Sequence, residues 1–245
     1  MVLERLMDSK TKLDAYEVIE KAWLKLRNGK YFAGSGVGEV YYETESDVAP
    51  VKFDLSVEFR QPVELTIEIL NNTSSERDYT AKLLPNSLLV RQSNETASKL
   101  YSPKRLSFDK RFTAITYTVF LDFWLFLAGR DDEEGLYRGR HRFTLEDPKK
   151  TAHVQIVQDL RAKFDWSDGR YLWLVGSNLY KSEQFLVIDK NDFALVGFAQ
   201  RSYIEKLPEW MKLLYINPFQ KRGPFFERAT HFSCYVALPS HELKG

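Results

Sequence analysis

The sequence predicts a single α+β domain over residues 1–245 that is mainly antiparallel β. We expect one long curved sheet, or incomplete β-barrel, of about ten strands, with an N-terminal helix and lid helices over its concave face. Two observations predict this class. After Gly29, short runs alternate between apolar and polar residues, and turn-forming residues separate these runs. No composition break marks a linker, and all-β domains of this length are common as single units.

The first expected element is an amphipathic helix from about Ser9 to Leu26. Its apolar residues recur at spacings of three and four, which places them on one stripe: Leu13, Tyr16, Ile19, Ala22, Trp23 and Leu26. Ser9 can cap the start of the helix, and Asn28-Gly29 can end it with a residue that tolerates positive φ. Such a helix is expected to lie on an apolar surface.

The clearest alternation predicts a β-hairpin. Residues 51–60 are apolar at odd positions and polar at even ones, Gln61-Pro62 interrupts the pattern, and residues 63–69 resume it with the same parity. A loop at residues 60–62 would set three apolar pairs: Phe59 with Val63, Leu55 with Ile67, and Phe53 with Ile69. One face of this hairpin would be covered and the other wet, as is usual for antiparallel sheets.

Further strands are expected at short intervals, separated by turns such as Asp189-Lys-Asn-Asp192. They span residues 31–43, 79–84, 87–92, 99–102, 137–145, 152–165, 170–175, 184–188, 193–201 and 230–238. Two more helices are expected at residues 113–127 and 204–215. The apolar run Phe112–Leu127 has 16 residues with Asp122 inside it, which is too short for a membrane span and favours a buried helix or lid segment.

Motifs for catalysis, metal binding or nucleotide binding are missing from the sequence. Gly34-Ser-Gly-Val-Gly38 lacks the spacing of a phosphate-binding loop, and glycines in a strand usually mark a bend, a bulge or a close backbone approach. Cys234 is the single cysteine and is expected to be buried in a strand. The four histidines have no ligand-spaced partner nearby: His141, His153, His231 and His241. We therefore expect no cofactor, no metal and no enzymatic activity, although a site assembled from distant residues is an alternative.

Charge and the N-terminus restrict the partners. Thirty-five basic and 34 acidic side chains leave a net charge of +1, which argues against nucleic-acid binding. The basic run Arg138–Arg142 predicts a solvated sheet face or, alternatively, a docking stripe for an acidic partner. The first residues contain no apolar core of signal-peptide length, so we expect a cytoplasmic protein, or a periplasmic or extracytoplasmic one whose leader has been removed.

Aromatic residues suggest a function. Four of them crowd into seven positions of the expected lid segment, and others lie on the first helix and the hairpin. A curved sheet with an apolar, lidded concave face can enclose a cavity for a long hydrophobic ligand, although such residues also form ordinary cores. The predicted ligand-binding residues are Trp23, Phe53, Leu55, Phe59, Phe120, Phe123, Trp124 and Phe126.

The order of elements resembles the periplasmic lipoprotein-carrier superfamily, the LolA/LolB-like fold. The resemblance rests on three segments that follow the amphipathic helix: the strand Tyr31–Val40, the proline-containing hairpin Phe59–Leu65, and the late hairpin Phe185–Leu195. It implies an incomplete β-barrel with helices as a lid over a cavity for acyl chains, and work outside the cytoplasm. The first hypothesis is thus non-enzymatic binding or carriage of a lipid or other hydrophobic ligand. The alternative is a structural or adaptor subunit with a protein partner.

Overall fold

The computed structural model describes residues 14–43, 51–60, 64–71, 79–84, 87–92, 99–101, 142–151, 154–177, 183–203 and 231–244. In these ranges eleven strands form one antiparallel sheet in the order β6-β5-β4-β3-β2-β1-β11-β10-β9-β8-β7, where the sequence predicted about ten strands. The strands are β1 (Tyr31–Glu43), β2 (Val51–Arg60), β3 (Glu64–Asn71), β4 (Tyr79–Leu84), β5 (Ser87–Gln92), β6 (Lys99–Tyr101), β7 (Arg142–Leu145), β8 (Tyr171–Ser177), β9 (Glu183–Asp189), β10 (Leu195–Tyr203) and β11 (His231–Lys244).

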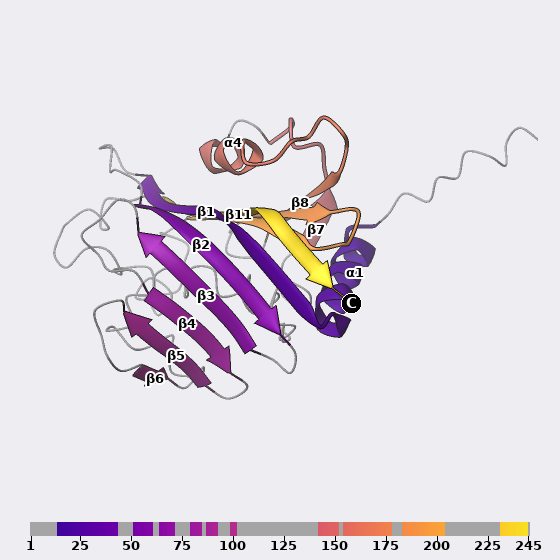
Figure 1. Ribbon diagram of the computed structural model, residues 1–245. Coiled ribbons are helices and arrows are strands. Elements are labelled where there is room, and N and C mark those ends of the chain that lie inside the picture. Colours follow the sequence, from indigo (N-terminus) through magenta and orange to yellow (C-terminus); the bar gives the residue numbers. More distant parts are fainter. Residues whose placement is uncertain are drawn as a thin grey trace, which may run out of the picture.

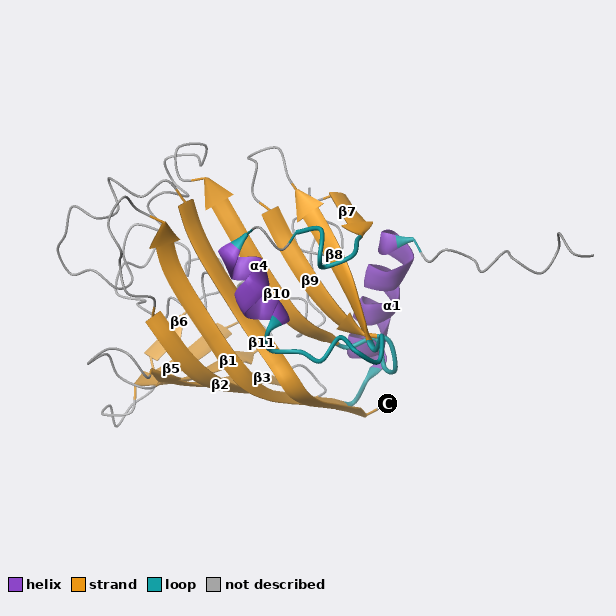
Figure 2. Cartoon of the chain, turned by 90° about the horizontal axis from the view of Figure 1, so that it is seen from above, coloured by secondary structure: helices purple, strands orange, loops and turns teal. Residues whose placement is uncertain are grey.

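The sheet is open and strongly curved, which is consistent with the expected incomplete barrel. Strands β1 to β6 form one wall, and β10 to β7 turn away from it beyond β11 (Figures 1 and 2). Helix α1 (Ala15–Asn28) lies on the concave side, whereas helix α4 (Gln155–Arg161) lies on the convex side over β10 and β11. Mainly antiparallel β structure is therefore confirmed. The expected helices at 113–127 and 204–215 lie outside the described residues.

Helix α1 buries Ile19, Ala22, Trp23 and Leu26 of its predicted apolar stripe, but the prediction was wrong for Tyr16, which is 52% exposed. Ser9 and Leu13 lie outside the described residues. Val18, Ile19, Ala22 and Leu26 are each at most 1% exposed. The helix ends at Asn28 as expected, but Gly29 is extended (φ −69°) instead of left-handed. The backbone then turns directly into β1, where the Lys30 N–H donates to the Lys244 carbonyl oxygen at 2.9 Å. This bond ties the end of the helix to the end of β11.

The predicted hairpin exists, but its register was wrong by two residues. Phe59 pairs with Leu65 and Leu55 with Ile69, because β2 continues to Arg60 and β3 begins only at Glu64. A shift of two residues keeps every side chain on its predicted face, so alternation alone could not detect it. The alternation itself is confirmed: Leu55 and Val57 are buried, whereas Lys52, Asp54 and Ser56 are exposed.

The strand predicted over residues 152–165 is wrong, because this segment contains helix α4. Val154 and Ile156 suggested a period of two. However, Ile156, Val157, Leu160 and Phe164 also follow helical spacing, and all four are buried. Short apolar runs fit both periods. Here packing against β10 and β11 decides for the helix.

Strands β9 and β10 and the central part of β11 are covered on both faces. In β9, Gln184 to Asp189 are all buried, as are Ser233 to Leu238 in β11. On the convex face a side chain at Gly197 would meet Val187 and Phe164 at 2.9 Å and 3.1 Å. The continuous apolar sequence of these strands reflects this double burial. Cys234 is fully buried in β11, as predicted.

A β-bulge in β11 changes which side chains reach the concave face. Ser35 pairs with Ser240 and Val37 with Ala237, so Leu238 and Pro239 together oppose Gly36. The extra residue reverses which residues of β11 face the concave side. Before the bulge these are even-numbered residues such as Val236, and after it they are the odd-numbered residues His241 and Leu243. Proline suits this position because it cannot donate a ladder hydrogen bond. The glycine motif thus marks a close backbone approach, one of its predicted meanings.

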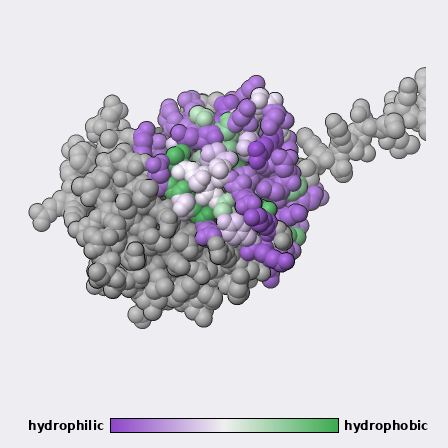
Figure 3. Space-filling view, viewed as in Figure 1, coloured by the Kyte–Doolittle hydropathy of each residue, from purple (hydrophilic) through white to green (hydrophobic). Residues whose placement is uncertain are grey.

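The convex face carries both polar and apolar surface. In Figure 3, which looks onto it, hydrophilic residues dominate the surface around α1, and apolar or weakly polar residues gather over β1 and β11. Tyr235 donates to Glu39 there at 3.2 Å, and Lys52 lies 3.7 Å from the same carboxylate. Burial, together with the charge of Glu39, raises the pKa of the Tyr235 hydroxyl well above its usual value.

None of the described helices is long and apolar enough to cross a membrane.

Candidate functional site

A cleft of about 550 Å³ opens at one end of the concave face. It lies between the C-terminal half of α1, the turn that joins β9 to β10, and the end of β11. Its walls include Lys21, Leu24, Lys25, Asp192, Phe193 and Leu243. Pockets for small molecules commonly enclose about 300–1,000 Å³ and combine apolar walls with a few polar groups. The described cleft has both properties.

Phe193 reaches the cleft wall through an unusual backbone conformation. Its φ is +58°, which is rare for a bulky side chain and costs about 1–3 kcal/mol. Two aspartates stabilise the turn around it. Asp189 Oδ1 accepts a hydrogen bond from the Asn191 N–H at 2.8 Å, and Asp192 Oδ1 accepts one from the Ala194 N–H at 2.9 Å. The turn therefore holds an aromatic ring at the cleft, where the Lys21 Nζ lies 5.6 Å from the ring centroid.

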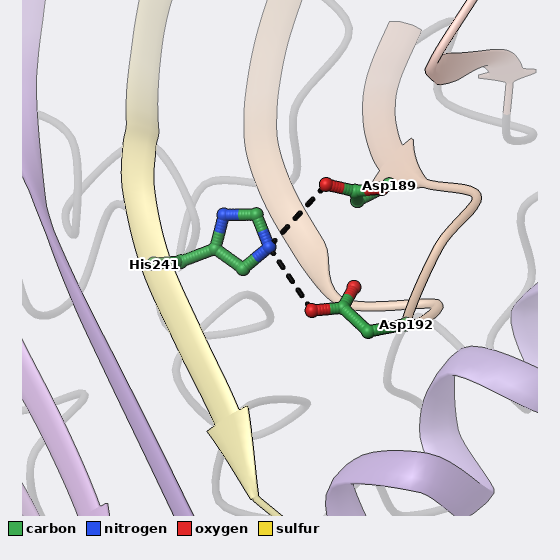
Figure 4. A group of neighbouring side chains, drawn as sticks. All are labelled: Asp189, Asp192 and His241. Carbon is green, nitrogen blue, oxygen red and sulfur yellow. Dashed lines mark hydrogen bonds and ion pairs between the residues drawn. The ribbon is translucent and has the colours of Figure 1, made fainter.

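Beside Asp192 lies a cluster of ionisable side chains (Figure 4). His241 Nε2 is 3.2 Å from Asp192 Oδ2 and 3.5 Å from Asp189 Oδ2. On its far side, Asp189 Oδ2 accepts a hydrogen bond from Arg170 Nε at 2.6 Å. Since two carboxylates face His241 Nε2, this nitrogen carries the proton and donates it. The cluster joins β11 to the β9–β10 turn.

Burial explains why these groups are paired. The side chain of Asp189 is fully buried and that of His241 is 2% exposed, so an unpaired charge here would be costly. Burial alone would raise the pKa of Asp192. The hydrogen bonds from His241 and the Ala194 N–H outweigh it and hold the pKa below its usual value. The hydrogen bond to Asp189 raises the pKa of the Arg170 guanidinium.

The same three side chains, Asp189, Asp192 and His241, are close enough to hold a metal ion. Aspartate oxygens and histidine nitrogens are ligands of Zn²⁺. Two features disfavour this use. Arg170 already bonds Asp189 Oδ2, and His241 Nδ1 is buried without a hydrogen-bond partner among the described residues, whereas a metal-bound histidine normally donates its second N–H. We interpret the cluster as an ion-pair latch that fixes the cleft wall.

The predicted ligand-binding residues stay predictions. Trp23 is 7% exposed in the core, and the Arg27 guanidinium lies 4.7 Å from its ring centroid. Leu55 is buried on the concave face, and Phe53 and Phe59 occupy β2 positions of the same parity. Neither Trp23 nor Leu55 is among the described residues that line the cleft. The aromatic residues Phe120, Phe123, Trp124 and Phe126 lie outside the described residues, as does most of the basic run, of which Arg142 is exposed in β7.

Sequence reasoning missed the residues that line the cleft. Lys21, Leu24 and Lys25 fall on the polar side of the helical stripe, and His241 lies beyond the strand end predicted at residue 238. One signal was available, because the turn Asp189–Asp192 was recognised. The left-handed conformation of Phe193 and the bulge before His241 depend on pairing with distant strands.

No protein-family model matches the sequence, and no significant match occurs among curated proteins. Similar chains occur among solved structures. A LolA superfamily protein from Nitrosomonas europaea has 12% identity and a TM-score of 0.35, covering 95% of this chain and 94% of its own. A DUF1329 family protein from Desulfovibrio piger has 8% identity and a TM-score of 0.33, covering 90% and 88%. An outer-membrane lipoprotein-sorting protein domain from Vibrio parahaemolyticus has 6% identity and a TM-score of 0.35, covering 93% and 91%.

The LolA-like resemblance predicted from the sequence is thus found among solved structures too. TM-scores of 0.33 to 0.35 give no support to a function, which must come from the residues of this chain.

Proposed function

We propose that this chain binds and carries a hydrophobic small molecule or an acyl chain, without catalysis, on the concave face of its sheet. The cleft beside α1 is the described end of this binding site. The observation that carries the proposal is the apolar wall made by Leu24, Phe193 and Leu243, which come from three separate elements. Leu24 is 41% exposed there, and an apolar ligand that covered it would gain about 1 kcal/mol from this side chain.

The curvature and width of the sheet support the proposal. On the concave face Phe32, Leu55 and Val57 are buried, whereas the opposite face of β2 is exposed and charged. Eleven strands at about 4.8 Å spacing span roughly 50 Å, and a helix about 10–12 Å across faces only two or three of them. The concave face therefore offers much more surface than α1 covers. The resemblance of the sequence to the lipoprotein-carrier superfamily supports a role for such a carrier outside the cytoplasm.

The ionisable cluster has a structural role in this proposal. His241 is 2% exposed and its protonated nitrogen faces two carboxylates, so its side chain cannot reach a ligand in the cleft as a general base. Its contribution is to hold Asp192 and the turn next to it. The cleft wall then keeps one shape with and without ligand.

The first test is native mass spectrometry of the purified protein, followed by organic extraction and lipid analysis. A stoichiometric co-purifying hydrophobic molecule is the expected result. Binding is then measured with N-phenyl-1-naphthylamine, an uncharged probe that fluoresces in apolar surroundings. A protein that carries no ligand, ignores the probe and self-associates would contradict the carrier and favour the adaptor alternative.

Two matched variants localise the binding. Leu24→Glu places a charge on the cleft wall and should weaken probe binding about tenfold, because burying an unpaired carboxylate is unfavourable. Tyr16→Glu is the control: Tyr16 is 52% exposed on the same helix and does not line the cleft. Equal probe affinity in the two variants would place the binding site elsewhere.

A further inference from the structure

We propose that the cleft selects a free long-chain fatty acid, whose carboxylate binds at Lys21 and Lys25 while its chain runs along Leu24, Phe193 and Leu243. This inference rests on the proposed function and names the ligand class of the same site. Its starting point is the distribution of charge and apolar surface around the cleft.

The two lysines occupy one wall of the cleft. Lys21 and Lys25 are four residues apart on α1, so they lie on the same helix face one turn from each other. Lys25 lies in the last turn, where a positive charge also offsets the helix dipole. Lys21 lies one turn earlier, where that effect is small, and its ammonium is next to the Phe193 ring. A ligand that is both charged and apolar would use both features.

The sum of the charges points to a single negative charge on the ligand. Among the residues that the structure describes, two lysines and one aspartate line the cleft, and Asp192 is ionised at neutral pH because its pKa is held down. The ionised wall groups thus have a net charge of +1. A monocarboxylate would neutralise what remains.

Phe193 joins the polar and apolar parts of the cleft. Its strained backbone positions a ring that lies near Lys21 and belongs to the same wall as Leu243. Strain of this kind persists only where the surrounding structure imposes it, and it concentrates at binding sites. In this arrangement a carboxylate at Lys21 would place the first methylene groups of its chain against Phe193.

The test compares three ligands with the same chain and different head groups: dodecanoate, dodecanol and dodecyltrimethylammonium. Each is titrated calorimetrically below its aggregation concentration. Ion pairs near a protein surface each contribute up to about fivefold in affinity. We therefore expect dodecanoate to bind about tenfold more tightly than dodecanol, and the cation to bind weakest. Added salt should reduce the advantage of dodecanoate.

The variant Lys21→Met/Lys25→Met keeps apolar helix-forming side chains and removes both charges. It should bind dodecanoate and dodecanol equally. The control Lys30→Met/Lys163→Met removes two exposed lysines that do not line the cleft, and it should keep the preference. A preference that survives in the first variant, or equal binding of both ligands by the unmodified protein, would overturn the fatty-acid inference and leave the hydrophobic carrier intact. Failure of all three ligands to bind would overturn both.

Discussion

Replacing Gly36 with alanine tests the register that places His241 in the site. At this position β11 bulges toward β1, and Leu238 and Pro239 oppose a single residue. Real Cβ atoms essentially never come closer than 3.0 Å to another heavy atom. A Cβ added to Gly36 would approach the backbone oxygen of Ala237 more than 1 Å closer than that. Because a backbone atom cannot rotate away, the two strands must separate.

The cost follows from what this separation breaks. The β1–β11 pair lies inside the sheet, with β2 on one side and β10 on the other. A displacement of about 1 Å would weaken two or three neighbouring ladder hydrogen bonds, at roughly 1 kcal/mol each. Forced repacking of the buried side chains adds about 1–3 kcal/mol. We expect Gly36→Ala to lower the free energy of unfolding by about 3–5 kcal/mol, a large share of the roughly 5–15 kcal/mol typical of a native protein.

Urea titration followed by tryptophan fluorescence measures this loss, with Ser35→Ala as the control. Ser35 is the exposed neighbour of Gly36 in β1, and its replacement should change stability by less than about 0.5 kcal/mol. If Gly36→Ala matched the control, β11 could not bulge at Leu238–Pro239. The alternation beyond Pro239 would then be reversed, and His241 would not face Asp192.

Three further outcomes are expected. Asp189→Asn should lower the free energy of unfolding, measured in urea, by about 2–3 kcal/mol. This is less than the usual cost of breaking a buried ion pair, because the side chain of Arg170 is 38% exposed and can be rehydrated. A loss under about 0.5 kcal/mol would contradict the latch. The pKa of Asp192 is lower in the folded than in the unfolded protein. Its ionised carboxylate therefore adds its full stabilisation above the unfolded-state pKa of about 3.9, and this stabilisation is lost as the pH falls through the lower folded-state pKa. The difference in free energy of unfolding between the unmodified protein and Asp192→Asn, measured from pH 7 to pH 2.5, should therefore be constant near neutrality and shrink toward zero in acid. A difference that is unchanged at pH 2.5 would refute this account. Trp124→Asp should abolish uptake of the uncharged probe while far-ultraviolet circular dichroism stays unchanged, and undiminished uptake would remove the predicted aromatic cluster from the site.

Local patterns determined much of the fold. The apolar stripe of α1 places Ile19, Ala22 and Leu26 in the core, and the period of two in residues 51–60 separates the buried from the exposed face of β2. These predictions hold because each depends on side chains of one segment and one water-facing side. The same reasoning predicted that the glycines in residues 34–38 would mark a bend, a bulge or a close backbone approach, and Gly36 marks a close approach to the Ala237 backbone.

Tertiary structure decided what local patterns leave open. The hairpin register slipped by two residues without changing a face, and residues 155–161 became a helix because β10 and β11 offered it a surface. His241 meets Asp192 across 49 residues of sequence only because the bulge at Pro239 reverses the alternation of β11. Strand pairing between distant segments sets these features, and no period within one segment encodes it. The sequence by itself therefore determined the mainly antiparallel β class and the two faces of β2, whereas the cleft and its ion-pair latch required the folded sheet.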